Sequence, residues 1–156
     1  MTSSMTRTKV ILVCDDDPDI AEFVSFLLRK AGHAVEVAHN HSECLARFHA
    51  QPPDLVILDV RMPEHDGFWV AEKLTFEGNK APIMFMTAHD EPLYRLCAPI
   101  AGAVDYIAKP FDPDFLMERV QNALKNDPKD SNWFLQATQY EQSLLEDNPP
   151  SEQSFM

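Results

Sequence analysis

The chain has 156 residues, 45% of them hydrophobic, which is enough to bury the core of one domain. Its formal net charge is −12 at pH 7, so binding to nucleic acid through a broad basic face is disfavoured. No window reaches the roughly 18 apolar residues that cross a bilayer, and the polar start of the chain lacks the apolar core of a signal peptide. We therefore expect a cytoplasmic protein that contacts neither nucleic acid nor a membrane.

Strand and helix patterns alternate five times along the first 126 residues. Short apolar runs predict strands at 9–14, 34–38, 55–60, 82–87 and 104–108. Apolar residues at helical spacing predict helices that carry residues 20–28, run over 40–50, begin at 66–67, begin near 92 and follow 112–113. Pro99 falls inside the fourth helix and should shorten or distort it, because an interior proline costs about 3 kcal/mol.

The character of the strands predicts the fold class. They are solid apolar runs without in-out alternation, which is typical of parallel strands covered on both faces. The sequence thus predicts an α/β domain over 9–126. Its five-stranded parallel sheet is expected to be doubly wound, in the flavodoxin-like order 2-1-3-4-5, with helices on both faces. Residues 1–8 are expected to be extended or disordered.

The last thirty residues, 127–156, have a different composition. A polar linker precedes a run of apolar residues at roughly helical spacing, which predicts an amphipathic helix over 132–146 and a disordered end. This helix could pack back on the domain or serve as a docking or dimer helix.

The cysteines and one histidine pair give little support to a disulfide framework or a zinc site. The chain has an odd number of cysteines, Cys14, Cys44 and Cys97, and they form no C-x-x-C motif. This is typical of a chain whose thiols are reduced. Cys14 is expected to be an inert buried thiol on an apolar strand. His39 and His41 form an H-x-H pair without an evident third or fourth ligand.

Polar side chains stand at the carboxyl ends of four of the five predicted strands. They are Asp15, Asp16 and Asp17 at the first, Asp59 at the third, Thr87 at the fourth and Lys109 at the fifth. In an open parallel sheet, functional residues gather at the carboxyl ends of the strands, near the point where strand order reverses. We therefore expect the carboxylates of the first and third strands to converge, with the hydroxyl and the ammonium beside them.

Converging carboxylates need a neutralising partner, and their oxygens suit Mg²⁺, or Mn²⁺ in its place. Lys109 and Thr87 beside such a metal would cradle phosphoryl oxygens. No Walker loop is present, so a covalent acyl phosphate on Asp59 is the favoured chemistry. Aspartate runs also cap helices, and Asp17 before Pro18 is expected to do that.

Four stretches of the sequence carry a family resemblance. They are "ILVCDDDPDI", "LVILDVRMPEHDG", "IMFMTA" and "DYIAKPF". In this order and at these strand ends, the chain resembles the CheY-like receiver domain of bacterial response regulators, which act in two-component signalling.

The resemblance assigns roles to individual residues. It implies that Asp59 is the phosphoacceptor, that Asp16 is a direct metal ligand and that Asp15 acts largely through water. It also implies a metal contact from the backbone carbonyl of Arg61. Thr87 would turn toward the phosphoryl group and Tyr106 would change rotamer with it, while Lys109 would contact the phosphoryl oxygens. The Lys109–Pro110 peptide is expected to be cis.

The same resemblance implies a mechanism and partners. A phosphohistidine on a histidine kinase or histidine phosphotransfer protein would supply the phosphoryl group to Asp59. The chain would catalyse only its own phosphorylation and dephosphorylation, and the face of the fourth helix and fifth strand would change for a downstream protein. That face, or the C-terminal helix, is a candidate dimer contact. Because segment 127–156 is too short for a DNA-binding effector, we expect a single-domain regulator, a phosphorelay intermediate or a receiver module of a larger protein.

Two positions depart from the common pattern and bear on the alternative function. Arg61 and His89 lie two residues after Asp59 and Thr87, and we expect them to set the lifetime of the phosphorylated state. The alternative is a Mg²⁺-dependent phosphohydrolase with an Asp nucleophile. Such hydrolases usually carry a second Asp where this chain has Arg61, which counts against that function. A receiver fold that signals without phosphate is a third option.

Overall fold

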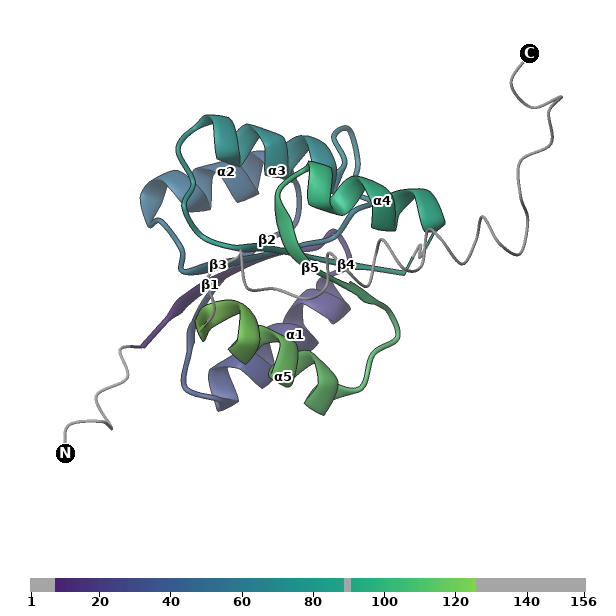
Figure 1. Ribbon diagram of the computed structural model, residues 1–156. Helices are drawn as coiled ribbons and strands as arrows, with labels where there is room; N and C mark the ends of the chain where they lie inside the picture. The colour runs from purple at the N-terminus through teal and green to yellow at the C-terminus, as the bar shows by residue number, and fades with distance from the viewer. Residues whose placement is uncertain (1–7, 89–90, 126–156) are drawn as a thin grey trace, which may run out of the picture.

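The computed structural model describes residues 8–88 and 91–125, in which five strands alternate with five helices (Figure 1). The strands are β1 (Val10–Cys14), β2 (Ala34–Ala38), β3 (Leu55–Leu58), β4 (Ile83–Thr87) and β5 (Ala103–Ala108). The helices are α1 (Pro18–Lys30), α2 (His41–Ala50), α3 (Gly67–Phe76), α4 (Pro92–Ile100) and α5 (Pro113–Lys125). The predicted linker, the helix over 132–146 and the chain end lie outside the described residues, as does nearly all of segment 1–8.

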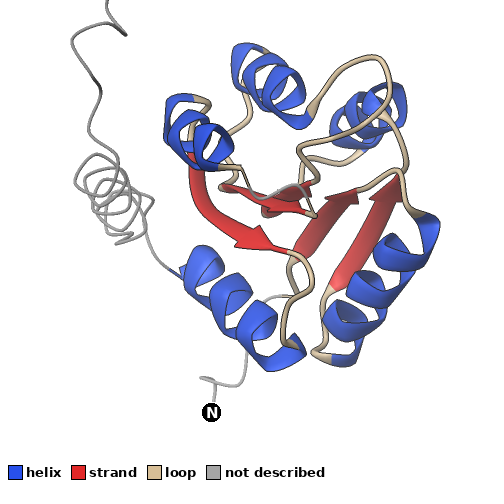
Figure 2. Cartoon of the chain, turned by 90° about the vertical axis from the view of Figure 1, so that its right-hand side faces the viewer, coloured by secondary structure: helices blue, strands red, loops and turns tan. Residues whose placement is uncertain are grey.

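The strands form one parallel sheet in the order β2-β1-β3-β4-β5, which confirms the predicted fold class. Helices α2, α3 and α4 cover one face and α1 and α5 cover the other (Figure 1). Figure 2 shows the same sheet from the side, enclosed between the two helical layers. None of the described helices combines the length and the apolar character that crossing a bilayer would require.

Alternate residues of each strand supply two separate cores. In β1, Leu12 belongs to the cluster under α2, α3 and α4, whereas Ile11 and Val13 belong to the cluster under α1 and α5. Both sides of the strand are therefore apolar, because each side meets a layer of helices. This arrangement explains why the strands read as uninterrupted apolar runs in the sequence.

Strand β3 is shorter than predicted. It ends at Leu58, while the buried residues Asp59 and Val60 continue beyond the ladder. The carbonyl of Val60 instead accepts a hydrogen bond from the amide of Gly67 at the start of α3, at 2.7 Å. The apolar run in the sequence thus extends past the strand because the following loop is also buried.

Pro99 does not interrupt α4, although this helix has only nine residues. The proline lies in the last turn, so its missing amide removes one helical hydrogen bond close to the end. The amides of Ala101 and Gly102 then bond to the carbonyls of Cys97 and Pro99 and close the helix. α4 ends at Ile100, one residue after Pro99, and is the shortest of the described helices, which agrees with the expected shortening.

Candidate functional site

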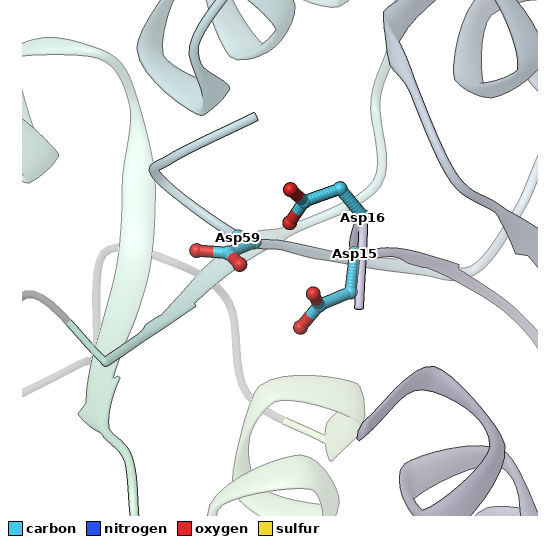
Figure 3. A group of neighbouring side chains, drawn as sticks. All are labelled: Asp15, Asp16 and Asp59. Carbon is cyan, nitrogen blue, oxygen red and sulfur yellow. The ribbon is translucent and has the colours of Figure 1, made fainter. Parts of the chain in front are cut away.

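Three carboxylates meet at the carboxyl ends of β1 and β3. These strands are neighbours, and Cys14 is paired with Leu58, so the residues that follow them lie side by side. One oxygen from each of Asp15, Asp16 and Asp59 lies within 4.8 Å of the others. Figure 3 shows the three side chains directed toward a common region. The predicted convergence of these acids is therefore present.

The three acids differ in burial. Asp15 has no exposed surface and Asp59 is 5% exposed, whereas Asp16 is exposed. The Oδ1 atoms of the two buried acids accept hydrogen bonds from backbone amides two residues later, Asp17 at 2.9 Å and Arg61 at 3.1 Å. These bonds hold Asp15 and Asp59 in fixed orientations, and Asp16 is the member open to solvent.

Lys109 bridges the two buried carboxylates. Its Nζ lies 2.6 Å from Oδ2 of Asp15 and 3.2 Å from Oδ2 of Asp59. Only 9% of the lysine side chain is exposed. The Lys109–Pro110 peptide that follows is cis, which confirms the expectation drawn from the resemblance.

Burial dominates the electrostatics of the site. Desolvation, followed by repulsion from Asp15, raises the pKa of Asp59 to about 6, although Lys109 and the amide of Arg61 act in the opposite direction. For Lys109, burial disfavours the ammonium, but the hydrogen bond to Asp15 and the charge of Asp59 outweigh it, so the pKa of Lys109 is raised. The lysine therefore remains charged while Asp59 holds a costly negative charge near neutral pH.

The backbone of Gly67 packs closely against the backbone of Asp59. A Cβ atom at Gly67 would lie 2.3 Å from the carbonyl oxygen of Asp59, far inside van der Waals contact. Only glycine lets the start of α3 approach this loop so closely. The residues at 66–67 were predicted to begin a helix, but a single sequence does not show that Gly67 touches the backbone of Asp59.

Asp17 stands apart from the acidic group, as predicted. Its Oδ1 accepts hydrogen bonds from the amides of Asp19 at 3.0 Å and Ile20 at 3.4 Å, and it is the N-cap of α1. The side chain therefore satisfies helix amides that would otherwise lack partners. The third aspartate of the run has a local structural explanation.

Asp16, Asp17, Asp59 and Lys109 border an open pocket of about 500 Å³. Arg61 also lines it with an exposed side chain, as does Ala88 just after β4. Thr87 is fully buried at the end of β4, and Tyr106 in β5 is 6% exposed with the Arg95 guanidinium 4.9 Å from its ring centroid. His89 lies outside the described residues, so its predicted role stays a prediction.

This donor set fits a hard divalent cation. Three carboxylates offer oxygen ligands, the type that Mg²⁺ prefers, and one of the acids is open to solvent. Lys109 supplies a positive charge next to two of these carboxylates. The pocket can therefore hold a dianionic group between a metal and an ammonium, which is the arrangement that phosphoryl chemistry needs.

Comparisons with known proteins show which family this chain resembles. The response regulator receiver domain family matches residues 11–121. The chain is 33% identical over 115 residues to the transcriptional regulatory protein TrcR of Mycobacterium tuberculosis, covering 74% of this chain and 45% of TrcR. It is 38% identical over 115 residues to the response regulator MprA of Mycobacterium avium, covering 74% of this chain and 50% of MprA.

A solved structure shows the same fold. The chemotaxis response regulator CheY4 of Vibrio cholerae is 30% identical, with a TM-score of 0.71 over 76% of this chain and 100% of CheY4. The chain therefore belongs to the response regulator receiver domain family of two-component systems. It spans about half the length of the curated relatives, so the description of TrcR as a transcriptional regulator applies to TrcR as a whole.

Proposed function

We propose that this chain accepts a phosphoryl group on Asp59 in a two-component system or phosphorelay. The observation that supports this most directly is the position of Asp59, which shares its site with Asp15, Asp16 and the Lys109 ammonium. A nucleophilic carboxylate, metal-ligating oxygens and a cation for the phosphoryl oxygens are thus within reach of one another.

In the proposed reaction, an Asp59 oxygen forms a bond to phosphorus as the phosphorus–nitrogen bond of a phosphohistidine breaks. The imidazole of the histidine kinase or histidine phosphotransfer protein leaves with the electron pair and takes up a proton. Asp15, Asp16, Asp59 and the backbone carbonyl of Arg61 would hold Mg²⁺ or Mn²⁺, which when bound offsets charge on the phosphoryl oxygens. A small donor such as acetyl phosphate would serve as well, because the receiver itself carries these groups.

The acyl phosphate is proposed to act as a switch. It adds about −1.5 to −2 charges next to Lys109 and Thr87, which are attracted toward it. The Tyr106 ring is buried under α4, with the Arg95 guanidinium over it. Phosphorylation would increase the population of this buried rotamer relative to rotamers that expose the ring to solvent. The α4–β5 face would then bind a downstream protein or a second receiver, and no contact with nucleic acid is part of the proposal.

Arg61 and His89 are proposed to control how long the phosphoryl group survives. The exposed Arg61 side chain lines the pocket through which water would reach the acyl phosphate. Arg61→Ala should change the rate of dephosphorylation, whereas Lys80→Ala, at an exposed position away from the pocket, should not. An unchanged rate in Arg61→Ala and in His89→Ala would refute this role.

Incubation with acetyl phosphate and Mg²⁺ tests the main proposal. Intact-mass measurement should find one addition of about 80 Da, located on the peptide with Asp59 and removed by hydroxylamine. Asp59→Asn should remain unlabelled, and chelation of the metal should prevent labelling of the wild type. Labelling elsewhere would overturn the proposal. Release of many equivalents of phosphate per chain would instead support the hydrolase alternative, which the presence of Arg61 at the position of the acid disfavours.

A further inference from the structure

Two cysteine side chains meet in the core, next to the end of β1 that carries Asp15. The Sγ atoms of Cys14 and Cys44 lie 2.7 Å apart, although the residues are 30 positions apart in the sequence. Cys14 is the last residue of β1, and Cys44 lies in the first turn of α2. Both residues have no exposed surface. The sulfur contact therefore joins two elements of the core and not two loops.

The backbones of both cysteines are held in place. The carbonyl of Cys14 accepts a hydrogen bond from the amide of Asp59 at 2.9 Å, and the amide of Cys44 donates to the carbonyl of Asn40 at 3.0 Å. Because rigid elements present the two sulfurs to each other, little chain entropy remains to be lost when they join. Two sulfurs alone do not make a zinc site, which needs four ligands.

We propose that Cys14 and Cys44 are a modification site that forms a reversible intramolecular disulfide on exposure to a peroxide. The proposal does not depend on phosphorylation of Asp59. Because neither sulfur is exposed, a small oxidant such as hydrogen peroxide suits the site, whereas a bulky disulfide donor could not enter it. Cys97 on α4 is partly exposed and outside this contact, so it supplies an internal comparison.

The chemistry balances with one peroxide. One thiol sulfur attacks the peroxide, becomes a sulfenic acid and releases the first water. The second thiol sulfur then attacks the sulfenic sulfur, the S–S bond forms, and hydroxide leaves as the second water with the displaced proton. Two thiols are oxidised by two electrons in total, and hydrogen peroxide is reduced to two waters. A thiol reductant reverses the modification.

Burial affects the rate and the product differently. It limits the access of the oxidant to both sulfurs, so the reaction is slow. The disulfide is neutral and apolar, so the same burial does not disfavour it. Oxidation should therefore be slower than that of an exposed thiol and yet yield a persistent bond.

The test uses the folded full chain and its Cys97→Ser variant. Treatment with hydrogen peroxide should lower the mass of both proteins by about 2 Da. After subsequent denaturation and alkylation, two cysteines of each protein should remain without the alkyl group. Non-reducing peptide mapping should recover a linked peptide pair with Cys14 and Cys44, and a thiol reductant should abolish it. The oxidised form should melt roughly 10 °C higher than the reduced form, because the bond closes a long loop.

Two variants make the outcome decisive. Cys14→Ser and Cys44→Ser should yield no intramolecular crosslink under the same treatment. Peptide mapping of the wild type alone decides the matter even if these core variants fail to fold. Alkylation of both Cys14 and Cys44 in the treated wild type, or a crosslink through Cys97 only, would overturn the proposal.

Discussion

Lys109 Nζ lies 2.6 Å from Oδ2 of Asp15, and this ion pair joins the end of β5 to the end of β1 across the two strands between them. Asp15 is fully buried, so the charges meet away from water. The same ammonium reaches Asp59, and one lysine therefore offsets two buried carboxylates. A buried pair of this kind costs most when only one partner is removed.

Lys109→Met should destabilise the metal-free protein by about 3 kcal/mol at pH 8, because two buried carboxylates then lack a cation. The loss should be smaller at pH 5, where Asp59 can take up a proton instead. Urea unfolding in the presence of a chelator measures both values. Lys80→Met is the control at an exposed position and should change stability little. Equal losses at the two pH values would contradict this account of Lys109.

Asp59 should make the metal-free protein less stable as pH rises. Its pKa is raised from 3.8 to about 6, so the folded chain keeps this proton longer than the unfolded chain does. The contribution of Asp59 to stability is therefore lost between about pH 4 and pH 6 and stays lost above that window. The size of this contribution is about 2–3 kcal/mol.

Asp59→Asn, which cannot ionise, should accordingly be more stable than the wild type by about 2–3 kcal/mol at pH 8 and equal to it near pH 3.5. Unfolding by urea in a chelator, repeated from pH 3.5 to pH 8, gives the difference curve. Asp114→Asn makes the same chemical change at an exposed position and is the matched control. A flat curve for Asp59→Asn would show that the raised pKa is wrong.

Gly67→Ala should be strongly destabilising, by about 3 kcal/mol or more, because its Cβ would lie 2.3 Å from the Asp59 carbonyl oxygen. Gly102→Ala is a suitable comparison. That residue has a φ of +88° but no atom within 4 Å of the added Cβ, so only the backbone strain of about 1 kcal/mol applies. Thermal unfolding of the two variants checks the order, and a smaller effect at Gly67 than at Gly102 would contradict the packing argument.

Much of the fold could be predicted because local patterns and global structure agree. Solid apolar strands and alternating elements both indicated a doubly wound sheet. The helix predicted over 40–50 is also present, and the Asn40 side chain at its start accepts a hydrogen bond from the Glu43 amide at 2.8 Å. The convergence of Asp15 and Asp59 followed from strand order alone. These features depend on periodicity and topology, which a single sequence records.

Contacts between distant side chains could not be predicted in the same way. The Cys14–Cys44 contact depends on how α2 packs over β1, and no spacing of residues along the chain indicates it. The burial of the Tyr106 ring depends on the choice of a side-chain rotamer, which the apolar pattern of β5 leaves open. The end of β3 was placed too late because Val60 is buried without joining the ladder.

The acidic run also allows a structural role and a metal-binding role to be separated at adjacent positions. Asp17 caps α1 through the amides of Asp19 and Ile20, whereas Asp16 belongs to the carboxylate group. Asp17→Ala should lower stability by about 1 kcal/mol and leave Mg²⁺-dependent labelling by acetyl phosphate within about twofold of wild type. Asp16→Ala should do the reverse, with little change in stability at this exposed position and loss of labelling at low Mg²⁺.

Chemical unfolding and labelling rates at several Mg²⁺ concentrations, measured on both variants, compare the two roles. Loss of labelling in Asp17→Ala as severe as in Asp16→Ala would mean that the third aspartate binds the metal as well.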